Sequence, residues 1–204
     1  MIKAKALAIL VCVSVGIPFL VLGSSATLQE ARAEEKKEQL RSVQSYNFPK
    51  AFIRHKDGLG FATEISSELE RKQASWYVCP GLAGGDTISF RSLDFPNQYL
   101  RHPDGRLKLH DFEDADLFKK DASYKRFNGL AKDGWTSFES VNFPDCFIRH
   151  KAGEIWVEKN NGTEVFAKDA TFRLVDPLTE DKVAAFRKAA EKGDVEAMIK
   201  VGLA

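Results

Sequence analysis

The sequence predicts an all-β fold, and three observations carry this prediction. The 204-residue chain holds 15 Phe against 4 Tyr and 3 Trp, which suits many short apolar segments that each place a large side chain in a shared core. One long motif occurs three times in the middle of the chain. Within each repeat, short alternating segments are separated by turns rich in Pro, Gly and Asn, as in antiparallel strands.

Composition and charge exclude several classes of protein. Hydrophobic residues make up 44% of the chain and charged residues 29%, so wholesale disorder is not expected. The 30 basic and 29 acidic residues nearly cancel, and no long run of one sign could follow a phosphate backbone. Nucleic acid is therefore not an expected partner. The length allows one ordinary domain and short additional segments, which rules out a large multidomain enzyme.

The N-terminal segment has the layout of a targeting sequence. Two lysines, Lys3 and Lys5, precede an uncharged run over residues 6–23, and the small residues Ala31 and Ala33 follow. Residues 1–33 are predicted to be a secretory signal peptide. The alternative is a membrane anchor formed by residues 6–23, because a run of this length can also span a bilayer. We expect a secreted, periplasmic or cell-surface protein, with residues 34–41 as a polar spacer.

The threefold repeat organises the middle of the chain. Its copies are SVQSYNFPKAFIRH at 42–55, SFRSLDFPNQYLRH at 89–102 and SFESVNFPDCFIRH at 137–150. The final histidines, His55, His102 and His150, lie 47 and 48 positions apart. A second block follows in phase and reads QASW at 73–76, DASY at 121–124 and DATF at 169–172. A third block closes each unit and reads PGL at 80–82, NGL at 128–130 and DPL at 176–178.

The repeat length predicts the architecture. Each unit contains about four short segments of strand character, so three units supply about twelve strands over residues 42–178. A β-trefoil, which is a barrel capped by hairpins with threefold pseudosymmetry, fits this number. A three-bladed propeller falls below the usual blade number of about 4 to 8. A sandwich does not explain three equal units.

These motifs resemble a known family. The FIRH and YLRH segments after a Pro turn, the PGLAGG segment at 80–85 and the DATF block resemble the arabinose-binding domain of alpha-L-arabinofuranosidase B, carbohydrate-binding module family 42. The resemblance covers residues 42–178. It implies a β-trefoil that binds arabinofuranose side chains of arabinoxylan and arabinan.

The resemblance also implies the binding residues, namely the His that ends the Arg-His pair and the Asp that opens the DATF block. The implied pairs are His102 with Asp121 and His150 with Asp169. In the first unit His55 is followed by Gln73 instead of Asp, so this degenerate site is expected to be weak or lost, leaving two working pockets. A carboxylate can accept two sugar hydroxyls while an imidazole adds a directional partner. The structural alternative is that the Asp residues cap turns and the His residues are satisfied polar groups at strand ends.

The arginines that precede these histidines are predicted to be structural. Arg54, Arg101 and Arg149 are expected to pair with a nearby acid or carbonyl. Because side chains alternate along a strand, each Arg and its neighbouring His are expected to face opposite ways.

The C-terminal segment changes character. Residues 180–204 are rich in Ala, Lys and Glu and predict a helical hairpin with a turn at Gly193 and Asp194. The string AFRKAAEKGDVEAMIKVG resembles about half of a Sel-one-like repeat, although an ordinary amphipathic terminal helix is the alternative. Such repeats bury their apolar face against neighbours. This tail therefore either packs on the main domain, binds a protein partner, or marks a chain that once continued.

Three functions remain open. The leading hypothesis is a non-catalytic protein that binds arabinofuranose-containing polysaccharide. The first alternative is an accessory part of an alpha-L-arabinofuranosidase acting in L-arabinose metabolism, and the second is a scaffold whose tail mediates protein contacts. Glycoside hydrolysis needs two carboxylates across one cleft, whereas Asp121 and Asp169 occupy separate units, so no catalytic residue is expected. No cofactor or metal is expected either, and Cys79 and Cys146 are either a disulfide or two free thiols.

Overall fold

The computed structural model describes residues 38–179, 185, 189 and 192–196. The predicted signal peptide or anchor at 1–33 and most of the predicted hairpin at 180–204 lie outside these residues. In the part of the chain that is described, no helix is long and apolar enough to cross a membrane.

The described chain is built mainly of short strands, as predicted. The strands are β1 (Gln39–Ser45), β2 (Ala51–Lys56), β3 (Leu59–Glu64), β4 (Ser75–Pro80), β5 (Ile88–Ser92), β6 (Gln98–Arg101), β7 (Lys108–Asp111), β8 (Tyr124–Asn128), β9 (Thr136–Ser140), β10 (Cys146–Lys151), β11 (Glu154–Lys159) and β12 (Phe172–Val175). The short helices are α2 (Glu68–Gln73), α3 (Asp116–Asp121) and α4 (Glu164–Asp169). The all-β prediction is confirmed. Because β1 begins at Gln39, the first strand includes the last three residues of the predicted polar spacer.

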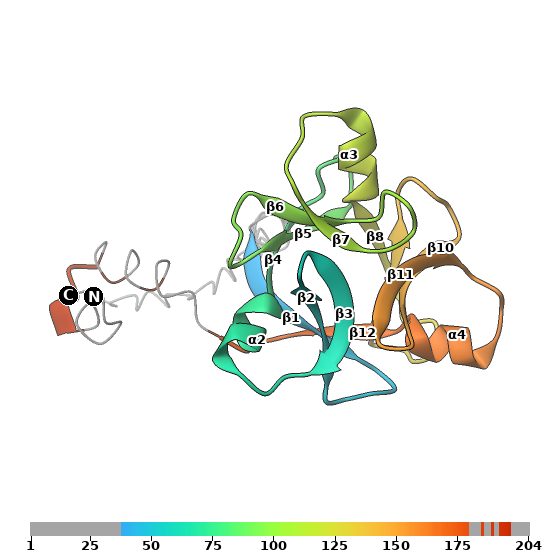
Figure 1. Ribbon diagram of the computed structural model, residues 1–204, viewed down its shortest axis with the longest axis horizontal. Helices are drawn as coiled ribbons and strands as arrows, with labels where there is room; N and C mark the ends of the chain where they lie inside the picture. Colours follow the sequence, from blue (N-terminus) through green and yellow to red (C-terminus); the bar gives the residue numbers. More distant parts are fainter. Residues whose placement is uncertain (1–37, 180–184, 186–188, 190–191, 197–204) are drawn as a thin grey trace, which may run out of the picture. The chain divides into compact units, whose positions relative to one another are not determined.

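All strands join in one antiparallel sheet. Its order is β10-β11-β3-β2-β1-β12-β9-β8-β5-β6-β7, and β4 pairs with both β1 and β5. Further pairing of β10 with β9 and of β3 with β7 closes the sheet on itself (Figure 1). Closure removes exposed sheet edges and encloses one core.

A hairpin, a short helix and a strand follow one another at three places in the chain. These are β2-β3-α2-β4, β6-β7-α3-β8 and β10-β11-α4-β12. Figure 1 shows the three helices at separate places around the sheet. The helices are not anticipated in the sequence analysis, although Ser67 and Glu70 form a capping box at the start of α2 and Thr163 caps α4.

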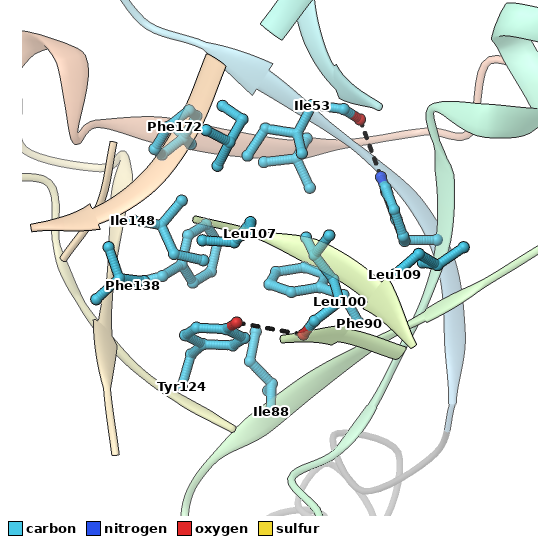
Figure 2. Close-up of a cluster of buried hydrophobic side chains, with 14 residues drawn as sticks. Ile53, Ile88, Phe90, Leu100, Leu107, Leu109, Tyr124, Phe138, Ile148 and Phe172 are labelled. Atoms are coloured by element: carbon cyan, nitrogen blue, oxygen red, sulfur yellow. Dashed lines mark hydrogen bonds between the residues drawn. The ribbon is translucent and has the colours of Figure 1, made fainter. Parts of the chain in front are cut away.

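The core gathers large side chains from every part of the sheet (Figure 2). Trp76, Tyr124 and Phe172, which end the three copies of the second block, are each 0% exposed. The Nε1–H of Trp76 donates to the carbonyl oxygen of Ile53 at 2.9 Å, and the Tyr124 hydroxyl donates to that of Leu100 at 3.2 Å. Burial of each such ring stabilises the fold by about 1.5–3 kcal/mol.

Some of the Phe side chains lie on the surface, which the sequence analysis did not anticipate. Phe48, Phe95 and Phe143, from the Phe-Pro step of each motif, are 57%, 49% and 48% exposed. The expectation that the Phe residues anchor a core is therefore wrong for these three, because each stands on a turn outside the closed sheet.

The two cysteines of the described chain are not bonded to each other. Cys79 in β4 and Cys146 in β10 are both free thiols, which resolves the alternatives left by the sequence.

Candidate functional site

Each Arg-His pair meets the Phe-Pro turn of another unit, and we call these meeting places junctions. The first junction joins His55 to Asp94 with Nε2 and Oδ1 2.7 Å apart, the second joins His102 to Ser140 with Nε2 and Oγ 2.9 Å apart, and the third joins His150 to Asn47 with Nε2 and Oδ1 2.8 Å apart. The third junction closes the ring, because it brings together residues 103 positions apart in sequence.

The motif serine holds each turn. In the third junction, the Ser45 hydroxyl accepts the backbone N–H of Phe48 at 3.3 Å and donates to Oδ1 of Asn47 at 3.1 Å. Ser92 and Ser140 accept the corresponding N–H of Phe95 and Phe143. Such side-chain to backbone bonds are typical of Ser at turns, and they fix where each Phe ring stands.

Each exposed Phe packs against the histidine of its junction, edge-on for Phe48 and Phe95 and tilted for Phe143. Ring centroids are 5.2 Å apart for Phe48 and His150, 5.5 Å for Phe95 and His55, and 5.7 Å for Phe143 and His102. An exposed aromatic ring beside a polar group is a surface that can cover the C–H face of a sugar. The sequence analysis missed these rings and Asn47, although the repeated motif contains all of them.

In the third junction, Asp169 ties the predicted residues together. Its Oδ2 accepts from Arg149 Nη2 at 2.7 Å, and its Oδ1 accepts from Asn47 Nδ2 at 2.8 Å. His150 Nε2 lies 3.6 Å from the same carboxylate. The structure thus places His150 and Asp169 close together. Arg149 and His150, expected to face opposite ways, both lie close to Asp169 at the end of α4, while Arg149 packs over Phe166 and His150 against Phe48.

The second junction has the same arrangement but is more deeply buried. Asp121 accepts from Arg101 Nη2 at 3.1 Å and from Asn142 Nδ2 at 2.8 Å. His102 is 0% exposed, and the Asp121 side chain is 3% exposed. His102 Nδ1 and Arg101 Nε are buried without a hydrogen-bond partner. This junction therefore holds the predicted His102 and Asp121 inside the protein.

The first junction exchanges an acid for an amide. Gln73, at the position of Asp121 and Asp169, accepts from Arg54 Nη1 at 2.6 Å. The carboxylate is instead supplied by Asp94, which bonds His55 where the third junction has Asn47. His55 and Gln73 thus bond different residues, Asp94 and Arg54.

All three arginines have the structural role that was predicted. Arg101 pairs with Asp121 and Arg149 with Asp169, while Arg54 lies 3.3 Å from Glu70.

Burial controls the protonation of the junctions. Burial lowers the pKa of His102 and His150 below the usual 6.5, and the nearby Asp121 and Asp169 oppose this without reversing it. Both rings are therefore neutral at pH 7, with one nitrogen to donate and one to accept. At Asp94, burial alone would raise the pKa, but hydrogen bonds from His55 and Ser92 outweigh it and lower the pKa below 3.8.

The third junction opens into a hollow of about 460 Å³. Asn47, Phe48 and His150 line it together with Ala51 and Ala62, and Glu64 lies on its wall. A second, more polar hollow of about 690 Å³ lies beside α4 and is lined by Tyr46, Leu130 and Thr163, among others. Both volumes are within the range of about 300–1,000 Å³ that small-molecule sites occupy.

In the described part of the chain, the junctions offer polar side chains but no cluster of metal ligands. Within the described ranges, no group of three or more His, Cys, Asp or Glu side chains is arranged to hold a metal ion. Asp121 and Asp169 each form an ion pair with an arginine and occupy different junctions. What the third junction offers is a neutral imidazole, an amide and an exposed ring, which together suit uncharged polar ligands.

A family model described as the alpha-L-arabinofuranosidase B (ABFB) domain matches residues 40–191. The match covers most of the chain, and the protein belongs to this domain family. No curated protein gives a significant match.

Solved structures agree with this assignment. A GH54 α-L-arabinofuranosidase soaked with a cyclic sulfate inhibitor is 25% identical, with a TM-score of 0.66 over 70% of this chain and 32% of that chain. An arabinofuranosidase complexed with arabinofuranosyl-α-1,2-xylobiose gives 25% identity and a TM-score of 0.66 over 71% of this chain and 32% of that one. The chain thus spans about a third of the length of these enzymes. A BEL β-trefoil in its apo form is 10% identical with a TM-score of 0.50, over 66% of this chain and 90% of that one, and shows likeness of fold alone.

Proposed function

We propose that the protein binds arabinofuranose side chains of a polysaccharide such as arabinoxylan or arabinan and does not cleave them. The observation that carries this proposal is the third junction, where His150, Asn47 and Phe48 line one hollow. Membership of the ABFB domain family and the likeness to arabinofuranosidases support the choice of sugar.

The chemistry of the third junction suits an uncharged sugar. His150 bonds Asn47 through Nε2, which leaves its other ring nitrogen to bond a hydroxyl group, and Asn47 keeps a second Nδ2 hydrogen that can donate to one. Phe48 is 57% exposed and offers a flat apolar face to the sugar's C–H groups. Asp169 holds Asn47 in place and uses both of its oxygen atoms within the protein. Its main role in this proposal is to position the amide.

The absence of catalysis is part of the proposal. Hydrolysis of a glycoside needs one carboxylic acid to protonate the leaving group and a carboxylate opposite it, about 5 to 9.5 Å apart across the bond. Both oxygen atoms of Asp169 are hydrogen-bonded within the protein, to Arg149 and Asn47, and Asp121 lies in a different junction. The region of likeness covers 32% of the related enzymes, which leaves most of their length outside it.

The finer identity is proposed on the same grounds. We infer a β-trefoil of three repeats, a member of carbohydrate-binding module family 42, which the thrice-recurring order of hairpin, helix and strand supports. Export through a signal peptide at 1–33 fits a ligand that occurs outside cells. A Sel-one-like tail at 180–204 with a protein partner stays a prediction from the sequence.

The test is retention of the full chain on insoluble arabinoxylan, with debranched xylan and cellulose as matched supports. We expect retention on the branched polymer alone, reversed by a soluble arabinofuranosyl oligosaccharide. Release of arabinose from the polymer would contradict the non-catalytic part of the proposal. Equal retention on debranched xylan would contradict the arabinofuranose part.

A further inference from the structure

We propose that the protein has one working sugar site rather than two, and that the small side chains of Ala51 and Ala62 create it at the third junction. This inference rests on the proposed function, because the ligand is taken to be an arabinofuranosyl group. It concerns how many sites the chain has and which residues decide their size.

The first evidence is the difference in exposure between the two junctions that hold the predicted His and Asp pairs. The Asp169 side chain is 11% exposed and His150 lines the 460 Å³ hollow. In the second junction, the Asp121 side chain is 3% exposed and His102 is 0% exposed. A sugar hydroxyl needs direct access to its partner atom, and only His150 is placed to give it.

The second evidence is the size of the residues that stand at equivalent places in the hairpins. Ala62 is the cross-strand partner of Ile53, whereas Leu109 and Val157 are the partners of Leu100 and Ile148. The other two hairpins thus carry a larger aliphatic side chain, buried in the core, at the position where the hairpin beside the hollow has a methyl group.

The same contrast appears at the start of each hairpin. Ala51 follows the Phe-Pro turn at the third junction, and Gln98 and Cys146 occupy this position at the first and second. One step further along β3, Thr63 stands opposite Phe52, whereas His110 and Glu158 stand opposite Tyr99 and Phe147. Three positions that line the hollow, Ala51, Ala62 and Thr63, therefore carry smaller side chains than their equivalents in the other two hairpins.

The size argument explains the hollow in physical terms. A leucine in place of Ala62 adds three carbon atoms, and because the core beneath Ala62 is close-packed, these atoms have space only in the hollow. The ring of Phe48, the two alanine methyl groups and Thr63 then form an apolar wall, with Lys50 and Glu64 nearby to reach hydroxyl groups. A chain with one such site gains no avidity on a branched polymer, since avidity needs two linked sites.

The first experiment counts the sites. The full chain is titrated calorimetrically with a short oligosaccharide that carries a single arabinofuranosyl group. We expect one molecule bound per chain. Two equivalent molecules per chain would overturn this inference and leave the proposed function standing. Failure to bind any arabinofuranosyl sugar would overturn the proposed function itself.

The second experiment locates the site with matched variants. Phe48→Ala, Phe95→Ala and Phe143→Ala each remove a ring of similar exposure, 57%, 49% and 48%, so their effects on folding should be similar. We expect at least a tenfold loss of affinity for Phe48→Ala and less than a twofold change for the other two. Equal losses for Phe48→Ala and Phe143→Ala would contradict a single site.

The third experiment closes the hollow. Ala62→Leu copies the residue that the second unit carries at this position, so the hairpin geometry already accepts it. We expect at least a tenfold loss of affinity with an unchanged circular dichroism spectrum. Unchanged affinity in a folded Ala62→Leu protein would overturn the size argument. If this variant does not fold, Ala51→Gln makes the same test with the residue found at Gln98.

Discussion

Removal of Asp121 should destabilise the protein more than removal of Asp169, although the two residues occupy equivalent positions. Asp121 is the single carboxylate that pairs with Arg101 within the described chain. Arg101 is 9% exposed and its Nε already lacks a partner. In the Asp121→Ala variant, a buried guanidinium would lose its counter-ion and Asn142 would lose its acceptor.

Removal of Asp169 should cost less stability than removal of Asp121. Arg149 also pairs with Glu158 at 3.2 Å, so it keeps a counter-ion in the Asp169→Ala variant. Breaking a buried ion pair by removing one partner costs about 3–5 kcal/mol. Loss of a hydrogen-bonding partner by a buried group that keeps its counter-ion costs about 1–3 kcal/mol. The difference between these two costs is about 2 kcal/mol. We therefore expect Asp121→Ala to lower the free energy of unfolding by about 2 kcal/mol more than Asp169→Ala does.

Urea unfolding of the full chain, followed by tryptophan fluorescence, measures this difference. In a chain of this length each kcal/mol corresponds to about 2–4 °C in Tm, so thermal unfolding should rank the variants in the same order. Asp121→Asn keeps the size of the side chain and removes only its charge, and should lie between wild type and Asp121→Ala. Equal stabilities of the two alanine variants would refute this account of the junctions.

This result would also change how sugar binding by such variants is interpreted. The family resemblance implies that Asp121 and Asp169 are sugar ligands. Because both carboxylates hold an Arg and an Asn in place, a loss of binding in either variant would have to be separated from a loss of structure.

Three further predictions concern other parts of the structure. Burial lowers the pKa of His102 and His150 below 6.5, so the stability that depends on their neutral rings is complete above about pH 6.5 and declines as the pH falls through the lowered pKa values. The Tm should therefore decrease between about pH 7.5 and pH 5.5, and an unchanged Tm would contradict the burial argument. Tyr124→Phe should lower the free energy of unfolding in urea by only about 1 kcal/mol, because it removes the hydroxyl bonded to Leu100 while the ring still fits, as Phe172 does at the equivalent position. A loss above about 3 kcal/mol would refute this prediction. Burial raises the pKa of the Cys79 thiol to about 11. At about pH 8, alkylation of Cys79 by iodoacetamide should therefore be slower in the folded protein than in denaturant by on the order of 100-fold, as measured by peptide mapping. Equal rates would contradict the prediction.

Much of the fold could be predicted because the repeat imposes it. Period-two patterning and turn residues indicate strands directly, and the ends of the second block place Trp76, Tyr124 and Phe172 in the core. The short helices are harder to predict, since a helix of six residues leaves little periodicity. The capping box at Ser67 and Glu70 marks α2, and the N-cap Thr163 marks α4.

The candidate site could be predicted in part. The family resemblance implies His150 and Asp169 as a pair, and the structure places them 3.6 Å apart. Their third partner, Asn47, lies 122 positions from Asp169 and meets it only when the sheet closes on itself. Spacing along the chain cannot reveal such a contact, although ring closure of a threefold repeat requires that the last unit meet the first.

The most direct test of the account is a crystal structure of the full chain soaked with an oligosaccharide that carries one arabinofuranosyl group. We predict density for the intact sugar between Phe48, His150 and Ala62, with its glycosidic bond unbroken. Density at the polar hollow beside α4 or at the His102 junction, with the Phe48 site empty, would contradict the central claim.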